Sequence, residues 1–140
     1  MFMKLFKYIS GDNVQRQKVE MTAPVLMVYQ NMNNELITKD SNVDMSMRFY
    51  VPKVNQDNTP TPRQSDEFIK SEPEMTVATI RFGGWASISD YISNRDKLIS
   101  MLGDQAKDYD TINMITAGYD SPMTPFKRRN EVILKKKVAV

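Results

Sequence analysis

The sequence has 140 residues, of which 41% are hydrophobic and 26% charged, and its formal net charge is +2. This length and composition predict one globular domain over residues 1–140, and so small a net charge gives no indication of nucleic-acid binding. The chain contains neither histidine nor cysteine, which excludes disulfides, cysteine or histidine metal sites and a Ser-His-Asp triad within it. Because the usual general base and the usual thiol nucleophile are both missing, we do not expect an enzyme.

The chain shows no sign of a membrane span or of a leader sequence. No apolar run approaches the roughly 20 residues that cross a bilayer as a helix. The opening residues, MFMKLFKYISGD, form too short an apolar stretch, and one too interrupted by lysine, to act as a secretory signal. We therefore expect a cytoplasmic protein.

The first predicted element is a short amphipathic helix that ends before Gly11. Its apolar residues follow the i, i+3, i+4, i+7 spacing of one helical face, and they are Phe2, Leu5, Phe6 and Ile9. Lys4 and Lys7 lie off this face, where solvation is the ordinary interpretation of a lysine.

Two strands are predicted after this helix. In the first, Val19–Tyr29, Pro24 indicates an edge position or a bulge, because proline cannot donate to the ladder of backbone hydrogen bonds. The second, Val43–Val51, alternates apolar with polar residues. The polar segment Pro52–Ser65 carries further prolines and is predicted to be a long exposed loop.

The second half of the chain is predicted to contain one longer helix between strands. Residues 67–82 are expected to be extended and broken near Pro73, and the Gly83-Gly84 pair to form a turn. Ser87 and Asp90 have the spacing of a capping box, and Gly103 is placed to end the helix that they begin.

Two further strands are predicted over residues 111–117 and 131–135, with a loop over residues 118–130 between them. Short connections between strands favour antiparallel pairing. The whole pattern predicts an α+β fold in which helices pack on a curved antiparallel sheet.

Four segments identify a family more specifically than this pattern of elements does. They are FMKLFKYISGDN, KVEMTAPV, EMTVATIRFGGWAS and TAGYDSPMTPFKRRNEVIL, and they extend from Phe2 to Leu134. Together they resemble the SOUL haem-binding protein family, which includes the vertebrate haem-binding proteins. The resemblance implies non-covalent binding of haem or a related porphyrin, and it implies no catalysis.

The resemblance also implies a distorted antiparallel β-barrel, or a curved sheet, flanked by two α-helices. Members of the family usually have a segment with strands of the barrel before the first helix, whereas this sequence begins at that helix. We therefore expect the first strands to be missing, which would leave an unpaired sheet edge. A monomer is expected, and dimerisation through such an edge is the alternative.

A porphyrin site needs an apolar surface and a few cations that meet the propionates. Met3 and Phe6 of the first helix are the candidates for the apolar wall, and Lys4 and Lys7 can reach the propionates from its rim. In the family, the lysine immediately before the tyrosine of this helix is thought to meet a propionate. That position is Lys7 here, so the resemblance carries this role over.

A second family lysine lies in the late loop, at the position that Thr124 occupies here. That contact does not carry over, and Lys127 is the candidate substitute. Arg128 and Arg129 of the same motif are expected to tie the loop to the sheet through hydrogen bonds. Some members of the family ligate iron with a histidine, which this chain lacks. Any axial ligand would be Met, Tyr, Lys or an exogenous molecule, and iron-free porphyrin is expected to bind as well.

Three hypotheses of function stay open. The leading one is a carrier or buffer of haem or another tetrapyrrole, which lies in an apolar cleft beside the first helix. The second is a small-molecule effector-binding module, for which an acidic residue deep in the cleft would be expected. The third is a protein-interaction module that has kept the fold and lost the ligand. Without the resemblance, the aromatic residues of the first helix would be assigned to the core.

Overall fold

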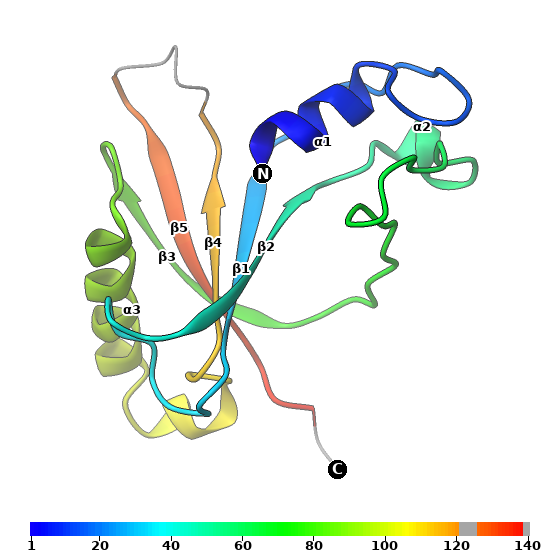
Figure 1. The fold of residues 1–140 in the computed structure, drawn as a ribbon. Helices are drawn as coiled ribbons and strands as arrows, with labels where there is room; N and C mark the ends of the chain where they lie inside the picture. The colour runs from blue at the N-terminus through cyan, green and yellow to red at the C-terminus, as the bar shows by residue number, and fades with distance from the viewer. Residues whose placement is uncertain (121–125, 139–140) are drawn as a thin grey trace.

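A computed structural model describes residues 1–120 and 126–138 of the chain (Figure 1). Its elements are, in order, α1 Phe2–Ile9, β1 Val25–Asn31, β2 Val43–Phe49, α2 Lys53–Gln56, β3 Val77–Gly83, α3 Ile88–Leu102, the 3-10 helix η1 Gly103–Asp108, β4 Met114–Gly118 and β5 Arg129–Lys135. Since α2 and η1 are short connections, α1 and α3 are the two substantial helices. Among the described residues no helix is long and apolar enough to cross a membrane.

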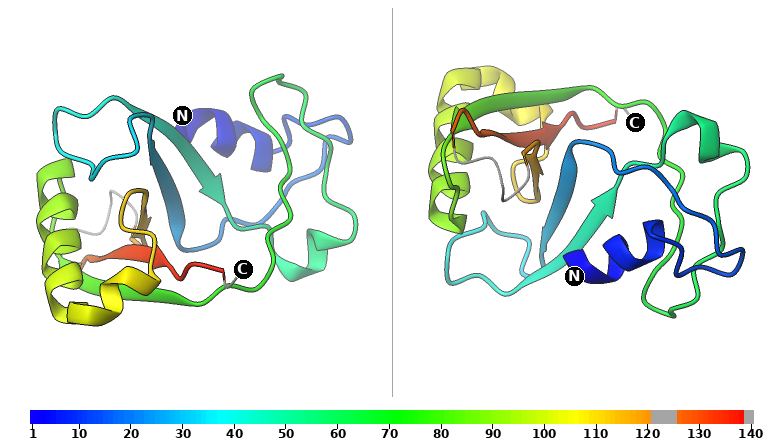
Figure 2. Two further views of the ribbon diagram at one scale, coloured as in Figure 1. Left: turned by 90° about the horizontal axis from the view of Figure 1, so that it is seen from below. Right: turned by 90° about the horizontal axis from the view of Figure 1, so that it is seen from above.

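The five strands form one antiparallel sheet in the order β2-β1-β4-β5-β3. Within the described part of the chain, β2 and β3 each pair on one side only, so the sheet stays open instead of closing into a barrel. Figure 2 shows how strongly the sheet twists, since β1 and β2 run at a steep angle to β3 and β5. This is the curved-sheet form of the predicted α+β fold.

The main hydrophobic core lies on one face of the sheet. The register places Tyr29, Met114 and Val132 on that face of β1, β4 and β5, and all three are buried. Tyr91 of α3 and Ile37 of the β1–β2 connection pack against them. Because side chains alternate between the two faces of a strand, the apolar residues of alternating segments gather on this face.

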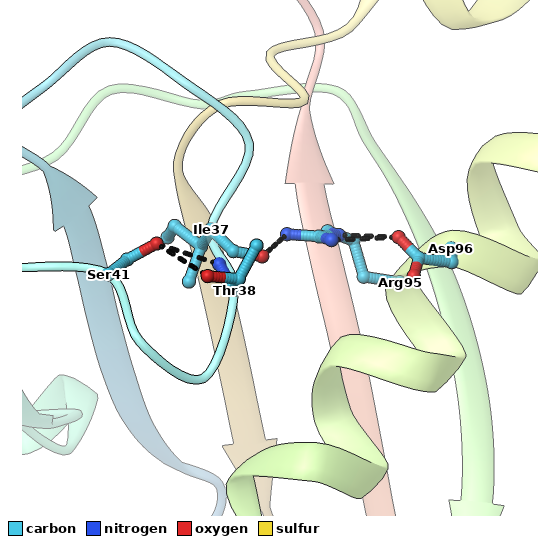
Figure 3. A network of polar contacts seen from close by, with 5 residues as sticks. All are labelled: Ile37, Thr38, Ser41, Arg95 and Asp96. Carbon is cyan, nitrogen blue, oxygen red and sulfur yellow. Dashed lines mark hydrogen bonds and ion pairs between the residues drawn. The ribbon is translucent and has the colours of Figure 1, made fainter.

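A buried arginine fastens the β1–β2 connection to α3 (Figure 3). Arg95 is 3% exposed, and its Nη1 donates to the carbonyl of Ile37. Its Nε and Nη2 donate to Oδ1 of Asp96 at 3.1 and 2.7 Å. A buried guanidinium without partners would be costly, so these contacts hold the connection in one position over the core.

A smaller apolar cluster lies where α1 contacts β2. It consists of Tyr8, Ile9 and Val19, with Phe49 of β2 packed against them. The backbone N–H of Val19 donates to the carbonyl of Ile9 at 2.7 Å, which keeps the chain that follows α1 against the helix.

Both predicted helices are confirmed. The Ser87 side chain accepts the backbone N–H of Asp90, and the Asp90 carboxylate accepts the backbone N–H of Ser87 at 2.8 Å, so the capping box is complete. Gly103 follows α3 with a φ of 56°. α1 ends at Ile9, shortly before Gly11, which has a φ of 119°.

Several predicted strand boundaries were wrong. β1 begins at Val25 instead of Val19, because Pro24 has no N–H to donate to the ladder. The proline does not mark an edge or a bulge, since β1 lies between β2 and β4 in full register. Of the two extended pieces predicted over residues 67–82, only the second is a strand, and it continues through Gly83. The predicted exposed loop over residues 52–65 contains α2 and a fully buried Pro60.

Candidate functional site

The apolar side of α1 is only partly covered by the rest of the fold. Ile9 is buried, but Phe2, Met3 and Phe6 have 39%, 58% and 42% of their surface exposed. Apolar surface in water is unfavourable by about 25 cal/mol per Å², and a group of such side chains on one side of a helix marks a surface that binds a partner. Met3 and Phe6, the residues predicted to form the apolar wall, are therefore accessible to a ligand.

Phe2 joins this apolar side to the sheet. Its ring centroid lies 5.9 Å from that of Phe6 in a stacked arrangement, and 5.4 Å from that of Phe49, the last residue of β2. Both distances fall in the range of about 4.5–7 Å in which aromatic pairs attract each other. The three rings form a continuous apolar wall, and we call Phe2, Met3, Phe6 and Phe49 together the α1 surface.

Polar contacts hold α1 behind this surface. Asn13 is fully buried, and its Nδ2 donates to the carbonyls of Tyr8 and Gln17 at 2.9 and 2.8 Å, while its Oδ1 accepts the Gln17 N–H at 3.0 Å. The Tyr8 hydroxyl donates to the carbonyl of Pro60. Satisfied buried polar groups specify one arrangement of the chain, so these two residues fix the end of α1. We did not predict either role, because the partners lie in loops without a sequence signature.

The sheet presents a row of residues beside the α1 surface. The register aligns Phe49, Val25, Gly118 and Asn130 on the adjacent strands β2, β1, β4 and β5. The Tyr91 hydroxyl of α3 lies 3.5 Å from Oδ1 of Asn130, which identifies this face as the one that α3 covers. Val25 and Gly118 are only half-buried, so neither helix covers the middle of the row completely.

The two lysines of α1 have different surroundings. The Lys4 ammonium pairs with the carboxylate of Asp66, and both side chains are exposed. This hydrogen bond raises the pKa of Lys4 and lowers that of Asp66. Lys7 is exposed, and among the described residues its ammonium has no hydrogen-bond or ion-pair partner. Because Lys7 lies one helical turn after Met3, its stem runs beside the α1 surface.

The β4–β5 connection was predicted to supply two further site residues. Thr124 lies outside the described residues. Lys127 is exposed and has a φ of 56°, a left-handed conformation that few residues other than glycine adopt. Its position just before β5 puts it at the same end of the sheet as Gly118 and Asn130.

The two arginines after Lys127 fasten this connection, as predicted. The backbone N–H of Arg129 donates to the Asp120 carboxylate, and the Arg129 guanidinium lies 3.4 Å from the same group. These contacts lower the pKa of Asp120. The Arg128 guanidinium lies 3.8 Å from the centre of the exposed Trp85 ring, close enough for a cation–π interaction.

A partly buried carboxylate near α1 was not predicted. Oε2 of Glu67 is buried and has no hydrogen-bond partner among the described residues. Burial raises the pKa of Glu67, and the nearby carboxylates of Asp66 and Asp12 raise it further. Its neighbours come from two separate segments, so no local motif could have revealed it.

The opposite face of the sheet carries a hollow that does not fit a tetrapyrrole. Its floor includes Val28, Ile115 and Ile133, and its rim includes Arg48 and Glu72, which pair at 2.9 Å. The hollow has a volume of about 160 Å³, whereas sites that enclose a drug-sized ligand have about 300–1,000 Å³. Across residues 1–120 and 126–138, no cluster of three or more acidic side chains could hold a metal ion.

Comparison with known proteins identifies relatives over nearly the whole chain. Residues 1–135 match the model of a family described as SOUL heme-binding protein. Heme-binding protein 1 of Xenopus tropicalis is 35% identical over 93% of this chain and 66% of its own length. Heme-binding protein 2 of Homo sapiens is 35% identical over 97% of this chain and 64% of its own length. The chain thus spans slightly less than two thirds of the length of these curated relatives.

Proposed function

The chain belongs to the SOUL heme-binding protein family, and we propose that it binds haem or a related tetrapyrrole non-covalently, as a carrier or buffer and not as an enzyme. The observation that carries the proposal is the exposure of Phe2, Met3 and Phe6 on one side of α1. The names of the relatives, which are heme-binding proteins, support the choice of ligand.

The α1 surface supplies the apolar contact. A porphyrin is a flat, apolar ring system with two propionates along one edge, and it can cover several exposed side chains at once. Packing on Phe2, Phe6 and Phe49 removes aromatic surface from water, which contributes about 25 cal/mol per Å². Because Phe2 and Phe6 are only 39% and 42% exposed, each contributes less than the about 1.5–3 kcal/mol of a fully exposed side chain. The flexible thioether of Met3 adapts to the shape of the ligand.

Lys7 meets a propionate at the rim of this surface. Its ammonium is exposed, and it has no partner in the described part of the chain that the ligand would have to displace. Lys4 can take part only after leaving Asp66, so its contribution is smaller. Lys127, just before β5, offers a second cation, while Thr124 provides no charge at the position where the family has a lysine.

The absence of histidine determines what the site can do with iron. A thioether, a phenol, an amine or an exogenous molecule would be the axial ligand, because the chain has no imidazole or thiolate. The affinity therefore comes mainly from apolar contact and propionate pairing. Iron-free porphyrin should bind with an affinity close to that of haem.

A haem titration tests the proposal. We expect a shift of the Soret band and quenching of Trp85 fluorescence that saturate near one ligand per chain. Trp85 is the only tryptophan, so the fluorescence reports on one position. Weak binding that does not saturate would contradict the proposed function.

The variant Lys7→Ala tests the propionate contact. Loss of one exposed ion pair should weaken binding by about 0.2–1 kcal/mol, which is roughly a 1.4-fold to 5-fold change in the dissociation constant. Lys97→Ala, which removes an exposed lysine from α3, is the matched control and should bind as the wild type does. If the two variants bound haem with equal affinity, Lys7 would not contact the propionate.

A further inference from the structure

Gly118 is a glycine for which the described part of the chain gives no structural reason. Three of the five glycines in the chain have positive φ angles, and these are Gly11, Gly84 and Gly103. A Cβ at Gly83 would lie 3.3 Å from the carbonyl oxygen of Arg128, which explains the missing side chain there. Neither reason applies to Gly118, because its φ is not positive and no described atom would lie within 4 Å of an added Cβ.

A glycine without such a reason is unusual at this position in the sheet. It is the last residue of β4, and it pairs with Val25 of β1 on one side and with Asn130 of β5 on the other. Glycine weakens a strand, because it loses more backbone entropy than other residues and packs no side chain. Glycine in a strand often marks a place where a ligand or another backbone approaches closely.

The free space at Gly118 adjoins the α1 surface. Val25 separates Gly118 from Phe49 in the register, so the two residues lie two strand spacings apart, about 10 Å. On its other side, Nδ2 of Asn130 donates to the carbonyl of Gly84 at 2.8 Å. The α1 surface thus borders the free space on one side, and a fixed polar side chain borders it on the other.

We propose that Gly118 leaves the space into which the tetrapyrrole fits, so that the macrocycle contacts the backbone of β4 while it packs on the α1 surface. This inference rests on the proposed function and adds a specificity-determining residue to it. A flat ring can approach a strand closely only where no side chain projects toward it. A bulky side chain at position 118 would occupy the volume that the macrocycle needs.

Ring-current shifts in an NMR titration test this contact without any substitution. Iron-free protoporphyrin is diamagnetic, and its ring current shifts the resonances of nearby amides strongly. When it is added to the isotope-labelled full chain, the amide of Gly118 should shift as much as those of Met3 and Phe6. The amide resonance of Thr79 should not shift, because this residue lies on β3, two strands away from β4, with its side chain on the opposite face of the sheet.

The outcomes separate this inference from the proposed function. Shifts along α1 with an unchanged Gly118 amide would overturn the role of Gly118 and leave porphyrin binding intact. A spectrum that does not change at any residue with porphyrin in excess would contradict binding itself.

Three variants supply an independent measurement. Gly118→Leu fills the free space and should weaken haem binding by about tenfold or more, as expected from the cost of overpacking. Gly118→Ala adds one methyl group and should weaken binding less than threefold by the same argument. Thr79→Leu adds comparable bulk on the opposite face and should bind as the wild type does. Circular dichroism checks that each variant is folded, and a folded Gly118→Leu with wild-type affinity would overturn the proposal.

Discussion

The two main helices are both amphipathic, but they bury their apolar sides to different extents. In α3, Leu98 is 5% exposed and Arg95 is 3% exposed, and Nη1 of Arg95 donates to the carbonyl of Ile37. In α1, Phe2 and Phe6 retain 39% and 42% of their surface exposed. α3 therefore forms part of the protein's own core, whereas α1 presents apolar surface that a ligand can cover.

The two helices also differ in what holds them. α3 packs on the main core of the sheet, next to Tyr29, Met114 and Val132. α1 rests on a smaller cluster and on polar contacts, among them the buried amide of Asn13 and an ion pair of 2.8 Å between Asp12 and Arg63. Substitutions in α3 should thus change stability, while substitutions on the exposed side of α1 should change binding.

The largest effect is expected for Leu98→Ala in α3. Truncation of a buried leucine leaves a cavity and lowers the free energy of unfolding by about 2–5 kcal/mol. Denaturant unfolding of the ligand-free chain measures this change. A loss smaller than about 1 kcal/mol would show that α3 contributes less to the core than its burial indicates.

Phe6→Ala in α1 should weaken haem binding while it changes stability little. Because Phe6 is 42% exposed in the ligand-free chain, the free energy of unfolding should fall by less than about 1 kcal/mol. Haem affinity should fall about tenfold, since the ligand no longer covers that ring. Met101→Ala is the matched control, because Met101 is an exposed apolar residue of α3 at 71%. If both variants bound haem equally well, the α1 surface would not be the binding surface.

The smallest effect concerns Glu67, next to α1. Its pKa is raised above the ordinary 4.5, first by burial, so the protonated form is favoured in the folded state. The stability that this group contributes is present at acidic pH and is lost as the pH rises through the raised pKa. Glu67→Gln, which mimics the protonated form, should therefore stabilise the chain at pH 7 by less than about 1 kcal/mol after allowance for solvent screening.

The pH dependence of stability distinguishes an effect of the Glu67 charge from an effect of packing. Melting temperatures of the wild type and Glu67→Gln should differ at pH 7 and converge as the pH falls below 4.5, the ordinary pKa of the group. A difference that stays constant over this range would indicate packing instead of charge.

The sequence predicted the elements whose signals are local. The boundaries of α3 were predicted correctly from the capping box of Ser87 and Asp90 and from Gly103. The start of β2 was predicted correctly from the alternation of apolar and polar residues that begins at Val43. The start of β1 was wrong, because the apolar run before Pro24 resembles a strand although the ladder can begin only after the proline.

The candidate site was predictable only in part. The spacing of apolar residues in α1 indicated one apolar side, but no pattern in the helix itself distinguishes a side that faces the core from one that faces a ligand. The contact between Lys4 and Asp66 joins residues 62 positions apart, and the free space at Gly118 depends on the register of three strands. Such features follow from tertiary packing, so they became visible only in the folded structure.

Hydrogen exchange with and without haem compares the two helices in a single experiment. We expect saturating haem to slow the exchange of the α1 amides markedly, because the ligand covers Phe2, Met3 and Phe6 and binds the end of Lys7. The α3 amides should exchange at the same rate with and without haem. Unchanged exchange in α1 at saturating haem, or equal slowing in both helices, would contradict the claim that α1 presents the tetrapyrrole-binding surface.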